Sequence, residues 1–125
     1  PYWNEIKVVS LLDARRSEAY TAIYSQGGEL FKDTHAHILT KNSFSDLAKE
    51  KVLFVGTGAK KAKDILLSNP NWNFNFSYPS AAAMPTLALQ AKIKNEFQDI
   101  NTFTPTYLKP VRITESKKDA LGRKI

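Results

Sequence analysis

The most informative part of the sequence is the run Val52-Leu53-Phe54-Val55-Gly56-Thr57-Gly58-Ala59. Its first four residues are all apolar, which is typical of a buried strand. Two glycines follow, and they allow a strand to turn tightly into a helix. The next residues place Ala59, Ala62, Ile65 and Leu66 on one side of a helix and lysines on the other. The run therefore predicts a strand, a tight turn and a helix.

Three strands are expected on the N-terminal side of this unit. Residues 6–12 are apolar on both faces, as in a central strand, and residues 19–24 alternate in character. The sequence Gln26-Gly27-Gly28-Glu29 is typical of a hairpin turn, and residues 30–39 would return as the third strand. The opening is thus predicted to be an antiparallel meander. A short helix over 42–48 would connect it to the strand at 52–55.

A further strand and a last helix are expected on the C-terminal side. Aromatic residues at 72, 74, 76 and 78 would share one face of a regular strand, which favours packing over stacking on RNA bases. Ser80 suits the N-cap of a helix whose buried stripe would be Met84, Leu87, Ala88 and Ala91. Residues 106–110 are predicted to form an extended segment that lies over the body of the domain.

The order of these elements predicts an α/β fold. It is a mixed sheet, formed by the three-stranded antiparallel meander plus a further strand, with helices packed on its faces. This is the topology of one subdomain of the ribonuclease H-like, actin-like superfamily. We expect one such domain over residues 1–110 and a basic C-terminal tail over 111–125.

The lack of cysteine suits a reducing cytoplasm, and a basic charge balance raises the question of polyanionic partners. The 125 residues include no cysteine, and the formal net charge is +6 with a pI of about 9.6. No apolar run approaches the ~20 residues that span a bilayer, so no membrane association is expected. Much of the charge lies in the tail, where Lys109, Arg112, Lys117 and Lys118 could contact RNA or a partner. The alternative is a solvated tail, which we favour.

Two histidines raise the question of a metal site. His35 and His37 are two positions apart on an expected strand, so both imidazoles can point to the same side. A zinc site needs a further ligand. Asp33 is on the same face but lies about 13 Å from His37 along a strand, too far to complete the site. We therefore expect half-exposed strand histidines and no metal.

The glycine turn is a second candidate. A glycine turn at a helix N-terminus can hold a phosphate, and Lys60 and Lys61 would add positive charge to Gly56 and Gly58. The third glycine of a dinucleotide fingerprint is missing, because Lys61 occupies its place, and the P-loop ending is absent. We favour the structural role, in which the glycines allow a close approach of helix and strand.

A third candidate is the charged corner between the first two expected strands. It contains Asp13, Arg15, Arg16 and Glu18, and Tyr20 follows it. Two arginines beside two carboxylates can form a network that fixes a tight corner. In the alternative, Arg15 or Arg16 binds a phosphate or a carboxylate of a partner. We favour the internal network.

Four motifs together resemble one family, TsaB, also called YeaZ. The sequence from Asp13 to Tyr20 resembles the family's Asp-Ala-Arg-Arg-Gly-Glu-Val-Tyr signature, with Ser17 in place of glycine. The turn at 54–59 is similar to its glycine turn, with Thr57 at the variable position. Pro79-Ser80-Ala81 and Pro105-Thr106-Tyr107-Leu108-Lys109 resemble its last two motifs, with Lys109 in place of arginine. The motifs follow the family order and match its C-terminal domain only.

The resemblance implies a role without catalysis. TsaB-type proteins support the catalytic TsaD subunit, together with the ATPase TsaE, in forming threonylcarbamoyladenosine next to the anticodon of tRNA. The N-terminal half, which makes most of the TsaD contact in the family, has no counterpart here. The resemblance therefore implies no catalytic residue, no cofactor, indirect contact with tRNA and a cytoplasmic location. Homodimerisation is left open.

Two other functions remain as alternatives. One is a glycoprotease-like metallopeptidase, which would need a metal held by His35, His37 and a third ligand. The other is a direct tRNA-binding module that uses the basic tail with Lys60, Lys61 and Lys63.

Overall fold

The computed structural model describes residues 6–110 of the chain. It contains five strands, two helices and two short 3₁₀ turns. The strands are β1 (Lys7–Asp13), β2 (Glu18–Tyr24), β3 (Leu30–Ile38), β4 (Val52–Val55) and β5 (Trp72–Asn75). The helical elements are η1 (Ser45–Leu47), α1 (Ala59–Ile65), η2 (Ala81–Ala83) and α2 (Met84–Ile93). The predicted tail, with Arg112, Lys117 and Lys118, lies outside the described residues.

The five strands form one mixed sheet with the order β3-β2-β1-β4-β5. The meander β1–β2–β3 is antiparallel, as the hairpin signals predict. Strand β4 then pairs with β1 in parallel, and β5 pairs with β4 in parallel. Strand β1 is therefore central, and the predicted α/β fold with a mixed sheet is confirmed.

One face of the sheet, the core face, carries the hydrophobic core. Phe54 of β4 lies at its centre, fully buried, with ring centroids 5.4 Å from Phe44, 5.3 Å from Trp72 and 4.7 Å from Phe74. Helix α1 covers this face through Ala62 and Leu66, and the segment before β4 covers it through other apolar residues. The rest of the cluster consists of Val9, Leu11, Ala19, Ile23, Leu39, Leu47 and Val52.

Two local expectations need correction, and both concern where a helix begins. The helix predicted over 42–48 is only the turn η1, because Phe44 before it adopts a φ of 62° that a helix does not allow. Ser80 does cap, but it caps η2, accepting a hydrogen bond from the Ala82 N–H at 3.2 Å. Helix α2 starts later, with Pro85 in its first turn, where a missing N–H costs nothing.

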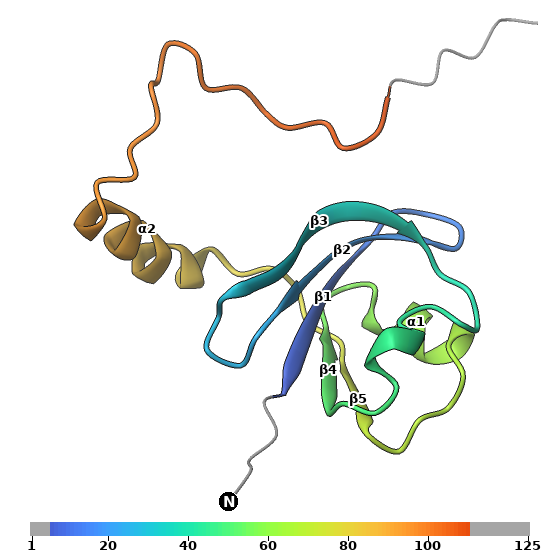
Figure 1. The fold of residues 1–125 in the computed structure, drawn as a ribbon. Coiled ribbons are helices and arrows are strands. Elements are labelled where there is room, and N and C mark those ends of the chain that lie inside the picture. The colour runs from blue at the N-terminus through green and yellow to red at the C-terminus, as the bar shows by residue number, and fades with distance from the viewer. Residues whose placement is uncertain (1–5, 111–125) are drawn as a thin grey trace, which may run out of the picture.

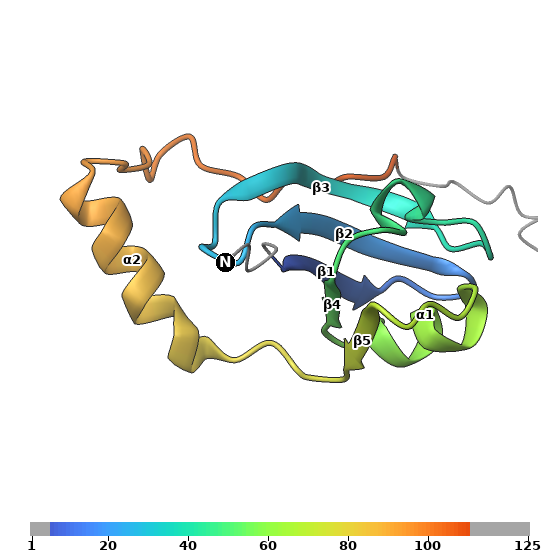
Figure 2. The same ribbon diagram turned by 60° about the horizontal axis from the view of Figure 1, so that its bottom comes forward.

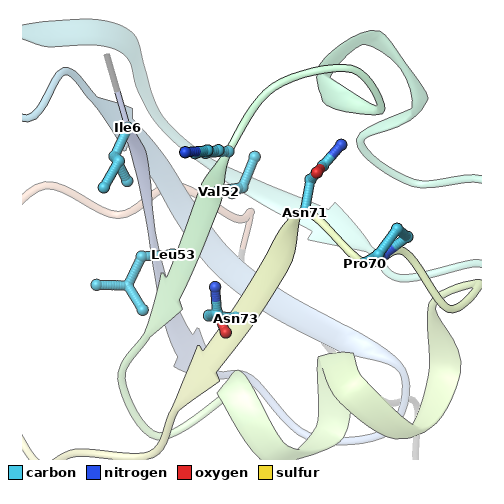
Figure 3. A pocket seen from close by; sticks show the side chains of 7 residues that line it. Ile6, Val52, Leu53, Pro70, Asn71 and Asn73 are labelled. Atoms are coloured by element: carbon cyan, nitrogen blue, oxygen red, sulfur yellow. The ribbon is translucent and has the colours of Figure 1, made fainter. Parts of the chain in front are cut away.

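The opposite face, here called the open face, includes Val8, Leu12, Tyr20, Tyr24, Leu53 and Val55. The strand registers place these residues together: Val8 pairs with Tyr24 and Leu53, and Leu12 pairs with Tyr20. All six are partly or well exposed to solvent. At the amino end of β4, Ile6, Leu53 and Asn73 line a hollow of about 390 Å³. Figure 3 shows how these side chains lie.

Helix α2 does not cover the open face. In both views it stands clear of the sheet, at the end of the segment that leaves β5 (Figures 1 and 2). The residues predicted to form its buried stripe, Met84, Leu87, Ala88 and Ala91, are not buried, and Met84 and Leu87 are 65% and 63% exposed. The prediction is wrong because an apolar stripe shows what a helix can bury and does not supply the surface that buries it.

Candidate interaction site at the carboxyl edge of the sheet

The parallel strands β1 and β4 end at the same edge of the sheet, where α/β folds place their functional groups. The charged corner follows β1, and the glycine turn follows β4. Both sequence candidates therefore lie side by side. A hydrogen bond from the Asp13 N–H to the Thr57 hydroxyl, at 3.0 Å, joins them directly.

The glycine turn is shaped by its contact with β1. Gly56 has a φ of 108°, and a Cβ at this position would lie 2.3 Å from the carbonyl oxygen of Leu11. Gly58 donates its N–H to the same oxygen at 3.0 Å. The amides of Gly56 and Ala59 are also used, by the carbonyls of Asn75 and Gly56. The glycines thus serve close packing, as favoured from the sequence, and these amides do not face a phosphate.

Lys61 of α1 holds the corner against the glycine turn. Its ammonium group pairs with the Asp13 carboxylate and donates a hydrogen bond to the backbone carbonyl of Glu18 at 3.1 Å. The hydrogen bond from Lys61 lowers the pKa of Asp13 below its ordinary value, against a smaller opposing effect of burial. One lysine therefore joins the end of β1, the start of β2 and the helix.

A second lysine joins the corner to the C-terminal segment. Lys109 pairs with the carboxylate of Glu18. Residues 106–109 line a hollow of about 340 Å³ on the open face together with Leu12 and Tyr20. The segment predicted to lie over the body does so here, but it bends at residues 108 and 109 and is not extended throughout.

The two arginines of the corner do not form the predicted internal network. Both adopt left-handed backbone conformations, with φ of 66° at Arg15 and 48° at Arg16, and both are exposed. Within residues 6–110, neither guanidinium makes a hydrogen bond or an ion pair. The network exists, but Lys61 and Lys109 supply its positive charges. These partners are 48 and 91 positions from Asp13 and Glu18, so local sequence patterns did not reveal them.

A shallow hollow of about 380 Å³ opens beside the corner, lined mainly by Asp13, Thr57, Lys60, Lys61 and Phe76. It contains charges of both signs, because Asp64 also lines it. Phe76 and its neighbour Tyr78 are exposed, since β5 ends at Asn75 and the expected strand alternation does not continue.

The two histidines have different hydrogen-bond partners. The Nε2 of His37 lies 2.9 Å from the Ser43 hydroxyl, and the Nδ1 of His35 lies 2.9 Å from the carbonyl oxygen of Asp33. Burial lowers the pKa of His37, and the nearby charges of His35 and Lys32 act in the same direction. In the described part of the chain, no three His, Cys, Asp or Glu side chains are arranged to hold a metal ion. None of the described helices could span a membrane.

Comparisons with known proteins give the fold. No protein-family model matches the chain, and no curated protein matches it. Solved structures do match it, and the descriptions of two of them contain the name YeaZ. One is described as an uncharacterized protein with similarity to peptidase YeaZ from Pseudomonas aeruginosa, with a TM-score of 0.64 and 23% identity over 82% of this chain. The other is YeaZ from Pseudomonas aeruginosa, with a TM-score of 0.56, 22% identity and the same coverage.

The chain has the YeaZ fold. It spans about half the length of these two proteins, 49% of each. This coverage agrees with the resemblance to a single domain of a YeaZ-type protein. The fold that the resemblance implies is thus confirmed from the structure.

Proposed function

We propose that this chain acts as a non-catalytic partner domain of the TsaB (YeaZ) type, in a complex that modifies tRNA with threonylcarbamoyladenosine. The observation that carries the proposal is the YeaZ fold together with the use of the carboxyl-edge groups in structural contacts. Asp13, Glu18, Lys61 and Lys109, the polar side chains best placed for chemistry, hold the corner together.

The partners follow from the resemblance. A TsaD-type subunit would perform the transfer, a TsaE-type ATPase would act on the assembly, and this chain would contact tRNA only indirectly. The protein would be located in the cytoplasm. Since the chain spans about half of its structural neighbours, TsaD binding is expected to depend largely on a preceding N-terminal half.

A chimera tests the proposal. The C-terminal half of a full-length TsaB would be replaced by this chain, and TsaD-dependent formation of threonylcarbamoyladenosine would be measured with purified components. We expect the chimera to support modification and to pull down TsaD, whereas this chain alone pulls down little. A well-folded chimera that binds TsaD and supports no modification would contradict the proposal.

Each of the two alternative functions can be tested by a separate experiment. Stoichiometric zinc or iron in the purified chain, with peptide cleavage, would favour the metallopeptidase. A gel shift with tRNA across a salt series would favour direct binding if the affinity fell steeply with salt.

A further inference from the structure

The corner between β1 and β2 carries two arginines that its internal network does not use. Two lysines from distant segments pair with the carboxylates of Asp13 and Glu18. Within residues 6–110, the guanidinium groups of Arg15 and Arg16 make neither a hydrogen bond nor an ion pair, and both residues are exposed. The lysines therefore neutralise the carboxylates next to the arginines and leave two guanidinium groups available to an outside ligand.

The backbone of this corner is fixed by hydrogen bonds at the end of the sheet. The Ala14 N–H donates to the Glu18 carbonyl, and the Glu18 N–H donates to the Arg15 carbonyl, both at 3.1 Å. The Arg15 N–H donates to the Asp13 carboxylate, also at 3.1 Å. A ligand that binds here orders little additional backbone, because the turn that carries both guanidinium groups is already held in one conformation.

The amides of the turn add two further donors. Among the described residues, the N–H groups of Arg16 and Ser17 have no hydrogen-bond partner. Successive N–H groups in a turn favour an anion. Both arginines have left-handed backbone angles, and residues held in such angles are enriched where proteins bind ligands. The donors of the corner are thus suited to an anionic group.

A further lysine and two aromatic rings lie next to the corner. Lys60 is exposed and lines the hollow of about 380 Å³ together with Asp13 and Phe76. Phe76 and Tyr78 are 50% and 77% exposed, and their ring centroids are 5.2 Å apart. Arginine, tyrosine and phenylalanine are the residue types that are enriched at the centres of protein interfaces.

We propose that the corner binds an acidic segment of a partner protein, with its carboxylates held by Arg15 and Arg16 and an apolar side chain packed on Phe76. A guanidinium group binds a carboxylate through two parallel hydrogen bonds, which an ammonium group cannot form. This inference does not rest on the proposed function, because it follows from the charges and the exposed groups of the corner.

Charge complementarity favours an acidic polypeptide over RNA. The hollow beside the arginines also carries the carboxylates of Asp13 and Asp64, and within residues 6–110 Asp64 has no ion pair. An RNA strand has a phosphate at every nucleotide, so it would bring phosphates against these carboxylates. A polypeptide can place carboxylates at the arginines and neutral side chains at Asp64, which gives complementary potentials.

Peptide binding to the whole chain tests the proposal. The probe is a fluorescent glutamate-rich peptide that contains one tryptophan, and the matched peptide has glutamine in place of every glutamate. We expect fluorescence anisotropy to show binding of the acidic peptide that weakens with added salt, and at least about tenfold weaker binding of the neutral peptide. Absence of binding by the acidic peptide at low ionic strength would overturn the proposal.

Paired substitutions separate recognition at the corner from general attraction to a basic protein. Arg15→Gln/Arg16→Gln is expected to weaken binding at least about tenfold. Lys49→Gln/Lys51→Gln removes the same charge just before β4 begins, at the opposite edge of the sheet, and should weaken binding less than about threefold. All four residues are exposed, so neither pair of substitutions disturbs the core. Equal weakening by the two variants would contradict the proposal.

The conservative variant R15K/R16K tests the geometry of the contact. It keeps both positive charges and replaces each planar guanidinium with an ammonium group. We expect the acidic peptide to bind this variant at least about threefold more weakly than the parent chain. An affinity equal to that of the parent would show that charge alone is recognised, which would refute the assignment to carboxylates.

Phe76→Ala tests the aromatic contact. It is expected to weaken binding of the peptide at least about threefold, because the tryptophan loses a ring to pack against. Phe97→Ala is the matched control, since Phe97 is also exposed and lies outside the corner. Equal affinities of these two variants would contradict the packing on Phe76.

An RNA strand is the competing ligand. We expect an oligouridylate with as many negative charges as the peptide to bind more weakly, and Arg15→Gln/Arg16→Gln to reduce its binding no more than the paired lysine substitutions do. Tighter binding of the oligouridylate through the same two arginines would assign the corner to RNA and overturn the proposal.

Discussion

The ammonium group of Lys61 lies 3.1 Å from the backbone carbonyl oxygen of Glu18, although 43 positions separate the two residues. With the Asp13 ion pair, this bond ties α1 to the corner between β1 and β2. We expect Lys61→Met to lower the free energy of unfolding by about 1 kcal/mol, since Asp13 is half exposed and its ion pair is partly screened.

The contribution of the Asp13–Lys61 ion pair to stability depends on pH. The pKa of Asp13 is lowered in the folded chain, so its contribution is complete above the ordinary value of 3.8 and disappears as the pH falls through the lowered pKa. Urea denaturation at neutral and acidic pH measures it, and NMR titration should show a higher Asp13 pKa in Lys61→Met. Lys60→Met, at the exposed neighbouring position, should leave both quantities unchanged.

Gly56→Ala should be severely destabilising. The new Cβ would lie 2.3 Å from the Leu11 carbonyl oxygen, and the φ of 108° is unfavourable for any other residue. We expect a loss of more than about 2 kcal/mol in thermal or urea denaturation. Gly27→Ala, whose Cβ would meet only the Ser25 hydroxyl at 3.7 Å, is the matched control and should change stability by less than about 0.5 kcal/mol.

Arg16→Gly should leave the fold intact or stabilise it. The backbone of Arg16 has a φ of 48°, which glycine adopts without strain, and its guanidinium has no partner within the described range 6–110. Relief of strain is partly offset by the greater freedom of glycine in the unfolded chain, so we expect a gain of up to about 1 kcal/mol. A clear loss of stability would show that the guanidinium supports the corner.

His37 should make stability depend on pH in the mildly acidic range. Burial is the main reason that its pKa is lowered, and Asp46 opposes the shift only weakly. The unfolded chain therefore binds a proton that the folded chain does not, and stability falls as the pH drops from about 6.5 towards the lowered pKa. His37→Gln should weaken this pH dependence of the free energy of unfolding, measured by urea denaturation at several pH values. His35→Gln should retain most of the pH dependence.

Thr21→Val should increase stability. Thr21 is fully buried in β2, and in the described structure its hydroxyl oxygen has no hydrogen-bond partner. Valine has nearly the same shape and does not bury a polar group, so we expect a gain of about 1 kcal/mol. Thr21→Ser is the informative comparison, since it keeps the hydroxyl and loses a methyl group. A valine variant less stable than the parent would show that the hydroxyl is satisfied.

Local patterns identified the strands, because apolar alternation and glycine turns depend on neighbouring residues. The glycine turn was predicted with its structural role for the same reason. The partners of Asp13 and Glu18 could not be predicted, since Lys61 and Lys109 reach them only after the sheet has formed. The left-handed Phe44 and the exposed α2 were also missed, because neither a single backbone angle nor the absence of a covering surface leaves a signal in composition.

The central position of β1 has a consequence for synthesis on the ribosome. Its antiparallel neighbour β2 follows at once, whereas its parallel neighbour β4 emerges only after β3 and η1. Until then the nascent polypeptide presents one unpaired edge of β1, and Val9 and Leu11 have not yet joined Phe54 in the core. A pause in translation within this interval would leave the protein open to aggregation and dependent on chaperones.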